Sequence, residues 1–135
     1  MKRPAMPRDL PPEAKAEWGR VVHILEEMGA LHTADRALLV RYCRGWDEWC
    51  SLDADLARTG RVIKGRDGNV VRNPLWLMRQ QSGQALNELS SALGISPSAR
   101  LRSGIKHQRP DEGESAGDIT APTAIDDYRA RLGAQ

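Results

Sequence analysis

The chain has 135 residues, a formal net charge of +2 and a hydrophobic fraction of 40%. This length fits one compact domain with a tail, and no apolar run approaches the roughly 20 residues that a membrane span needs. Because no apolar stretch follows the basic residues near the N-terminus, we expect no signal peptide. We therefore expect a soluble, non-secreted protein.

Charge is distributed unevenly along the chain. Residues 1–57 carry a net charge of −2, residues 58–105 carry +6 and residues 106–135 carry −2. A localised basic block is typical of a protein that binds a polyanion, whereas an ordinary solvated surface more often mixes its signs. The middle block is therefore the predicted contact for a polyanion.

Residues 1–11 are rich in proline, and we expect them to form a flexible N-terminal arm. A first helix is predicted to begin at Pro12 and to end at Gly29, because proline suits a first helical turn and glycine suits a helix end. Its apolar residues recur with a period of 3.6, as in an amphipathic helix.

A second helix is predicted from about residue 34 to residue 58, with Thr33 as its N-cap. Its apolar stripe is wide enough to contact two neighbouring helices. A short turn joins it to the first helix, so the two should form an antiparallel pair. Cys43 and Cys50 lie about 10 Å apart on such a helix, too far for a disulfide and too far to share a metal ion with His32.

Residues 61–72 have the pattern of a β-hairpin. Two short β-branched runs, 61–64 and 69–72, flank Gly65-Arg66-Asp67-Gly68, and glycine-containing turns of this length join antiparallel strands. Alternation along the strands leaves neither face wholly polar, so one face could pack while the other faces solvent.

A third helix is predicted to begin at Asn73-Pro74 and to end at Gly94, and a short fourth helix to begin at Ser96-Pro97. Residues 106–135 are polar and lack periodicity, which predicts a disordered tail. Within it, residues 124–133 could form a short docking helix that presents Ile125, Tyr128 and Leu132 to a partner; the alternative is a tail with a few apolar residues.

The predicted fold class is therefore mainly α. Two longer antiparallel helices form a helical-hairpin core with a third and a short fourth helix, and a small β-hairpin is inserted. We expect residues 12–105 to form this helical domain, followed by the tail at residues 106–135. Four tryptophans could all belong to the core, or one or two could serve an obligate interface.

The sequence contains no motif of a known catalytic site. It has no phosphate-binding GxxxxGK[ST] loop, no GxGxxG after a strand, no HExxH and no CxxC. Asp53 and Asp55 are two residues apart on a helix and point in different directions. We expect no enzyme activity, no cofactor and no metal.

The order of several motifs resembles the small subunit of phage terminases, in the P27-like family. The similarity covers residues 12–103 and rests on "LEEMGALHTADRALLVRYC" at 25–43, on "NP" at 73–74 and on "LGISPSAR" at 93–100. Ile95 and Ser96 replace a commoner Leu and Thr, which keeps an apolar residue followed by a helix cap.

This resemblance implies recognition of double-stranded viral DNA at the start of genome packaging, a homo-oligomeric ring, and delivery of DNA to the large terminase subunit. The large subunit carries the ATPase and the nuclease, so the small subunit is not the motor. The implied location is the host cytoplasm, outside the mature virion, with no membrane partner. Residues 124–133 would be the part that binds the large subunit.

The candidate DNA-binding residues are cations of the middle block: Arg61, Lys64, Arg66, Arg72, Arg79, Arg100 and Arg102. For Arg66 the alternative is a solvated loop charge, and for Arg100 a contact within its own subunit. Two other functions remain open. One is a winged helix-turn-helix regulator with the hairpin as its wing, which the acidic residues of the second helix disfavour. The other is a helical adaptor that does not bind DNA.

Overall fold

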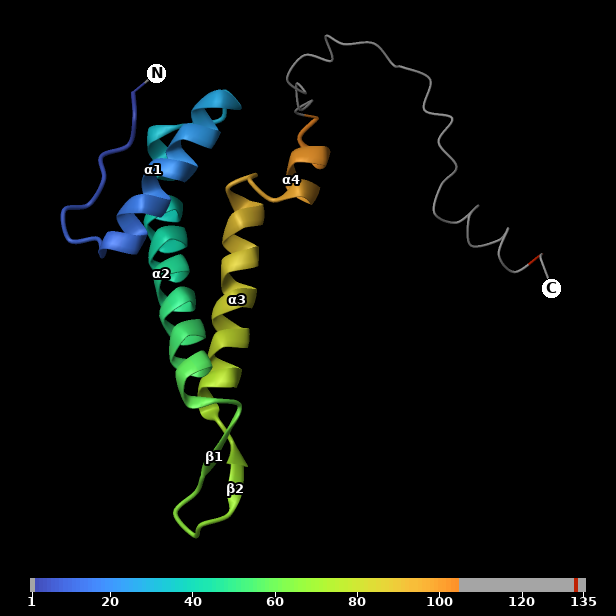
Figure 1. Cartoon of the computed structure of the whole chain (residues 1–135). Coiled ribbons are helices and arrows are strands. Elements are labelled where there is room, and N and C mark those ends of the chain that lie inside the picture. The colour runs from blue at the N-terminus through green and yellow to red at the C-terminus, as the bar shows by residue number, and fades with distance from the viewer. Residues whose placement is uncertain (1, 105–132, 134–135) are drawn as a thin grey trace.

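A computed structural model describes residues 2–104 and residue 133. The described chain is mainly helical with one two-stranded antiparallel sheet, which confirms the predicted fold class (Figure 1). The elements in order are α1 (Pro12–Glu27), a 3₁₀ turn η1 (Thr33–Asp35), α2 (Arg36–Thr59), β1 (Val62–Lys64), β2 (Val70–Arg72), α3 (Pro74–Ala92) and α4 (Pro97–Arg102). The predicted docking helix at 124–133 lies outside the described residues, except for residue 133.

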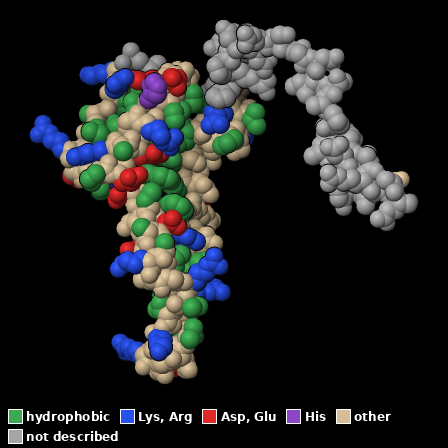
Figure 2. Space-filling model, viewed as in Figure 1, with side chains coloured by type: hydrophobic (Ala, Val, Ile, Leu, Met, Phe, Trp, Pro, Cys, Tyr) green, Lys and Arg blue, Asp and Glu red, His purple; other side chains and the backbone are tan. Residues whose placement is uncertain are grey.

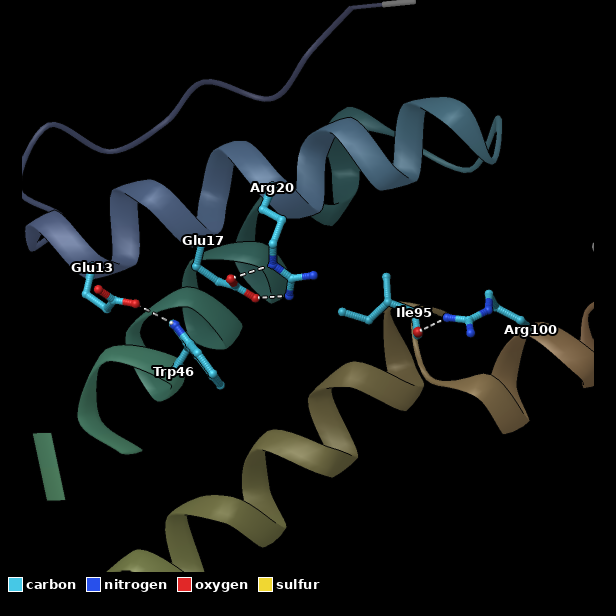
Figure 3. Close-up of polar contacts among 6 residues, drawn as sticks. All are labelled: Glu13, Glu17, Arg20, Trp46, Ile95 and Arg100. Carbon is cyan, nitrogen blue, oxygen red and sulfur yellow. Dashed lines mark hydrogen bonds and ion pairs between the residues drawn. The ribbon is translucent and has the colours of Figure 1, made fainter. Parts of the chain in front are cut away.

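The hydrophobic core lies where α1 covers the first half of α2. The two helices run antiparallel, and Trp46 Nε1 donates a hydrogen bond of 3.0 Å to Glu13 at the start of α1 (Figure 3). Leu93 at the end of α3 closes the same cluster from a third side. The buried members are Leu10, Ala14, Trp18, Val21, Val22, Leu25, Leu31, Leu39, Tyr42, Cys43 and Leu93.

One carboxylate is buried beside this core. Glu17 is 5% exposed and is paired with Arg20, whose Nε donates to it at 2.8 Å (Figure 3). Burial and the nearby Glu17 carboxylate raise the pKa of Tyr42 to about 12. The Tyr42 hydroxyl is therefore neutral at ordinary pH, and the buried charge of Glu17 is compensated by its arginine, as burial requires.

After Trp46, α2 continues to Thr59 alongside α3 (Figure 1). We call residues 47–59 of α2 and 74–85 of α3 the two-helix stalk. A Cβ at Gly83 of α3 would lie 3.2 Å from Trp49 Nε1, and one at Gly45 of α2 would lie 3.4 Å from a Leu86 methyl. Glycine inside a helix costs about 1 kcal/mol relative to alanine, and at these positions its small size permits close helix packing.

The N-terminal segment packs against the helices. Arg36 donates a hydrogen bond of 2.8 Å to the carbonyl oxygen of Ala5, Arg44 pairs with Asp9 at 2.8 Å, and Leu10 is buried in the core. The prolines of this segment favour an extended chain, and the extended chain lies along the helix pair.

The N-cap before α2 is one residue earlier than predicted. His32 Nδ1, not the Thr33 hydroxyl, accepts from the backbone N–H of Ala34 at 3.1 Å. The carboxylate of Asp35 in turn accepts from the His32 backbone N–H at 3.2 Å, which completes a capping box. An unprotonated ring nitrogen accepts a hydrogen bond as a hydroxyl does, so the side chain nearer the free N–H groups takes the role.

The predicted caps of α3 and α4 are confirmed. Asn73 Oδ1 accepts from the Leu75 backbone N–H at 3.1 Å, and Ser96 Oγ accepts from that of Ala99 at 3.3 Å. Asn73 also donates through Nδ2 to Thr59 Oγ1 and to the Gly60 carbonyl oxygen, both at 2.8 Å. One buried side chain therefore joins the end of α2 to the start of α3, at the base of the β-hairpin.

We expect Asn73→Ala to lower the free energy of unfolding by about 2 kcal/mol, since it removes a helix cap and two further hydrogen bonds. Urea unfolding followed by circular dichroism measures the change. Asn87→Ala, an exposed change inside the same helix, is the matched control and should have little effect. Equal stability of the two variants would contradict the role of Asn73.

Candidate nucleic-acid interface

The β-hairpin projects beyond the helices at one end of the molecule (Figure 1). Its strands pair in the register Val62 with Arg72, Ile63 with Val71 and Lys64 with Val70. The backbone N–H of Gly65 donates to the Asn69 carbonyl oxygen at 2.8 Å, which leaves a three-residue loop. Gly68 in that loop has a φ of 80°, the left-handed position that such loops require.

Every residue of both strands is exposed. Because cross-strand partners share a face and alternate residues do too, Val62, Lys64, Val70 and Arg72 lie on one face of the hairpin. The valines of this face are 60% and 69% exposed. The valines of this face are therefore open to solvent, while Arg72 of the same face lies against Trp76 of α3.

The hairpin is strongly cationic. Arg61, Lys64, Arg66 and Arg72 are exposed, and Asp67 in the loop is the one acidic residue among residues 61–72. Asn69 Nδ2 donates to Asp67 at 2.8 Å, and this bond holds the pKa of the Asp67 carboxyl below its usual range. Figure 2 shows Lys and Arg side chains beside hydrophobic side chains at this end of the molecule.

Arg72 is the one hairpin cation with an aromatic neighbour in the same subunit among the described residues. Its guanidinium carbon lies 5.0 Å from the centroid of the Trp76 ring, in the first turn of α3. A cation–π contact of this kind fixes the direction of the side chain and leaves its charge available.

The other predicted cations lie elsewhere. Arg79 pairs with Asp53 at 2.6 Å and so joins α3 to α2 within the stalk. Arg100 donates to the Ile95 carbonyl oxygen at 2.5 Å, which secures the corner between α3 and α4 (Figure 3). Arg102 is exposed on α4, at the opposite end of α3 from the hairpin (Figure 1). A helix of 19 residues is about 28 Å long, so these cations do not form one continuous patch.

The predicted partner-binding residues Ile125, Tyr128 and Leu132 lie outside the described residues. Sequence reasoning also missed a groove in the side of the helix pair. Trp46 and Trp49 stack with ring centroids 5.9 Å apart, and with Gly83, Leu86 and Asn87 they line an open pocket of about 310 Å³. The sequence feature that could have indicated this pocket is the pair of glycines inside the two helices, Gly45 and Gly83.

The charged groups of the hairpin are guanidinium and ammonium ions with one carboxylate, and such groups bind anions. Across residues 2–104, no three His, Cys, Asp or Glu side chains gather in a way that could hold a metal ion. In the same part of the chain, no helix is long and apolar enough to cross a membrane.

Cations that pair within the subunit and cations that face solvent should respond differently to substitution. Arg79→Gln should lower the free energy of unfolding by about 1 kcal/mol, because Asp53 loses its partner in a partly exposed pair. Lys64→Gln, on the exposed strand, should change it by less than about 0.5 kcal/mol. Thermal unfolding of both variants measures this, and equal losses would contradict the distinction.

Comparison with known proteins identifies the family. The family described as "Phage terminase, small subunit" matches residues 14–110, which is most of the chain. No curated protein and no solved structure is significantly similar to this chain. Members of this family are generally non-catalytic and work with DNA and a large terminase subunit. The resemblance seen in the motifs is thus confirmed at the level of the family, and the chain belongs to the phage terminase small subunits.

Proposed function

We propose that this chain, a P27-like terminase small subunit, binds double-stranded viral DNA through its β-hairpin. The observation that carries the proposal is an exposed hairpin with four cations against one carboxylate, which Asn69 already engages. Phosphate oxygens are the natural partners of such a surface, because each neutralised phosphate releases condensed counterions.

The shape of the hairpin suits the same partner. A two-stranded ribbon is narrow enough to enter the major groove of B-DNA, which is about 12 Å wide. The hairpin projects from the stalk, so DNA could reach both of its faces (Figure 1). Contacts from Arg61, Lys64, Arg66 and Arg72 to phosphates would position the duplex without reading its sequence.

The remaining candidate cations contribute less in this proposal. Arg79 and Arg100 already bind groups of their own subunit, so their guanidinium groups are less available to a phosphate. Arg102 lies at the far end of α3 and would reach only a second DNA segment or a neighbouring subunit.

The subunit then acts as part of an assembly. We propose that several copies form a ring in the host cytoplasm and bring DNA to the large subunit, which supplies the catalysis. In a ring, the few cations of each hairpin recur in every copy, so a weakly basic monomer becomes a strongly basic assembly. Residues 124–133 would dock on the large subunit through Ile125, Tyr128 and Leu132.

Replacing Arg61, Lys64, Arg66 and Arg72 together with Gln should weaken DNA binding without unfolding the protein. Four lost phosphate contacts should reduce the slope of log affinity against log salt by about 3.6 for each hairpin engaged. A salt titration of binding to a DNA duplex measures both quantities.

The matched control replaces four exposed cations of the N-terminal half, Lys2, Arg8, Lys15 and Arg41, with Gln. It removes the same charge, and we expect a much smaller change in affinity and slope. If the hairpin variant keeps the affinity and the slope of the parent protein, the hairpin is not the DNA contact.

Deleting residues 119–135 should preserve oligomerisation and weaken association with the large subunit. In the full-length chain, replacing Ile125, Tyr128 and Leu132 with Ala should have the same effect, because it removes the apolar side of the docking helix. A pull-down of the large subunit measures this, and retention at parental strength by both variants would refute the docking role.

A further inference from the structure

The two faces of the β-hairpin differ in exposure. One of them, which we call the open face, contains Val62, Lys64, Val70 and Arg72. The valines of the open face are more exposed than the apolar residues of the opposite face, Ile63 and Val71, which are 36% and 43% exposed. Covering exposed apolar side chains lowers the free energy, so the open face is a candidate contact surface.

The two faces also differ in charge, because the acidic residue of the loop lies on the opposite face. The Gly65 N–H pairs with the Asn69 carbonyl oxygen, so strand alternation continues to Gly65 and places it on the side of Val71. A Cβ at Gly65 would lie 3.2 Å from an Asp67 carboxylate oxygen and 3.5 Å from a Val71 methyl group. The charges of the open face are therefore both positive, and a polyanion suits it better than a second, equally cationic hairpin.

Each cross-strand pair of the open face joins one valine to one cation. Val62 is opposite Arg72, and Val70 is opposite Lys64. The long cationic side chains can extend sideways from the hairpin to phosphates, whereas the short valines reach only what lies directly against the face. For a hairpin in the major groove of DNA, base edges lie against that face, and the apolar group that they present is the methyl group of thymine.

We propose that Val62 and Val70 are specificity-determining residues that contact thymine methyl groups in the major groove. Two-stranded ribbons are known to enter this groove and to read base edges from it. The cations of the hairpin hold the duplex by its phosphates, and the valines add a preference for sites that contain thymine. This inference rests on the proposed DNA binding by the hairpin and gives that site a base that it prefers.

The test measures the affinity of the full-length protein for four duplexes of equal length. They are alternating dA·dT, the same duplex with uracil in place of thymine, alternating dG·dC, and the same duplex with 5-methylcytosine in place of cytosine. These pairs differ by a methyl group in the major groove and carry equal phosphate charge. The parent protein should bind the methylated member of each pair more tightly, by about fourfold for each methyl group contacted.

A serine variant, Val62→Ser with Val70→Ser, removes the apolar groups of the open face without changing its charge. It should bind the thymine and uracil duplexes equally, with the salt dependence of the parent protein. Val62→Ile with Val70→Ile keeps the face apolar and should keep the preference for methyl groups.

The matched control is Ile63→Ser with Val71→Ser, on the opposite face of the same strands. It removes apolar groups from the hairpin to a similar extent and should also keep the preference for methyl groups. Circular dichroism checks that every variant remains helical.

Equal binding of the parent protein to the thymine and uracil duplexes overturns the methyl contact and leaves phosphate binding intact. A thymine preference that persists in the serine variant overturns it too, because the preference then comes from the DNA and not from the valines. If the parent protein shows no such preference and the serine variant has a changed subunit number in native mass spectrometry, the valines form a protein contact instead. Failure of the parent protein to bind any of the four duplexes refutes the proposed function itself.

Discussion

The structure depends on the length of α2 relative to its two neighbours. Its first half is covered by α1 on one side and by the end of α3 on another, and this is where the fully buried side chains Leu25, Leu39, Val21 and Cys43 lie. Among the described residues, only α3 lies along its second half. Because burial of apolar area is the main driving force of folding, stability is concentrated at the α1 end, and the stalk depends on close packing along one seam.

That seam explains several unusual residues. Gly83 allows Trp49 of α2 to approach α3, and Arg79 of α3 pairs with Asp53 of α2. At the hairpin end, the Asn73 side chain makes three hydrogen bonds that join the two helices. The hairpin beyond Asn73 adds no buried side chain of its own strands to the fold. Its conformation is set locally by the loop glycine and by the strand pairing, and the cost of holding four cations close together is small because all four face solvent.

Local signals made much of this fold predictable from the sequence. Cap-then-proline pairs at Asn73-Pro74 and Ser96-Pro97, and glycines at 29 and 94 with positive φ, locate helix ends without knowledge of the tertiary structure. The misplaced cap at Thr33 arose because His32 is an equally capable acceptor one residue earlier. The partners of Arg79 and Arg100, the packing of the N-terminal segment and the groove beside Trp49 could not be predicted, since each depends on residues brought together only by the helix packing.

The distribution of charge along the stalk connects these observations to function. The exposed side of α3, with Leu77 and Met78, and the cationic hairpin are adjacent in sequence, and neither adds buried side chains to a single molecule. An apolar helix side lowers the free energy of the system when another protein covers it, and like charges are tolerated when a polyanion neutralises them. In the proposed ring the cationic hairpins of several copies would belong to one assembly, and their mutual repulsion would rise with every added copy. Binding DNA removes that repulsion, so DNA should stabilise the assembly as much as the assembly strengthens the binding of DNA.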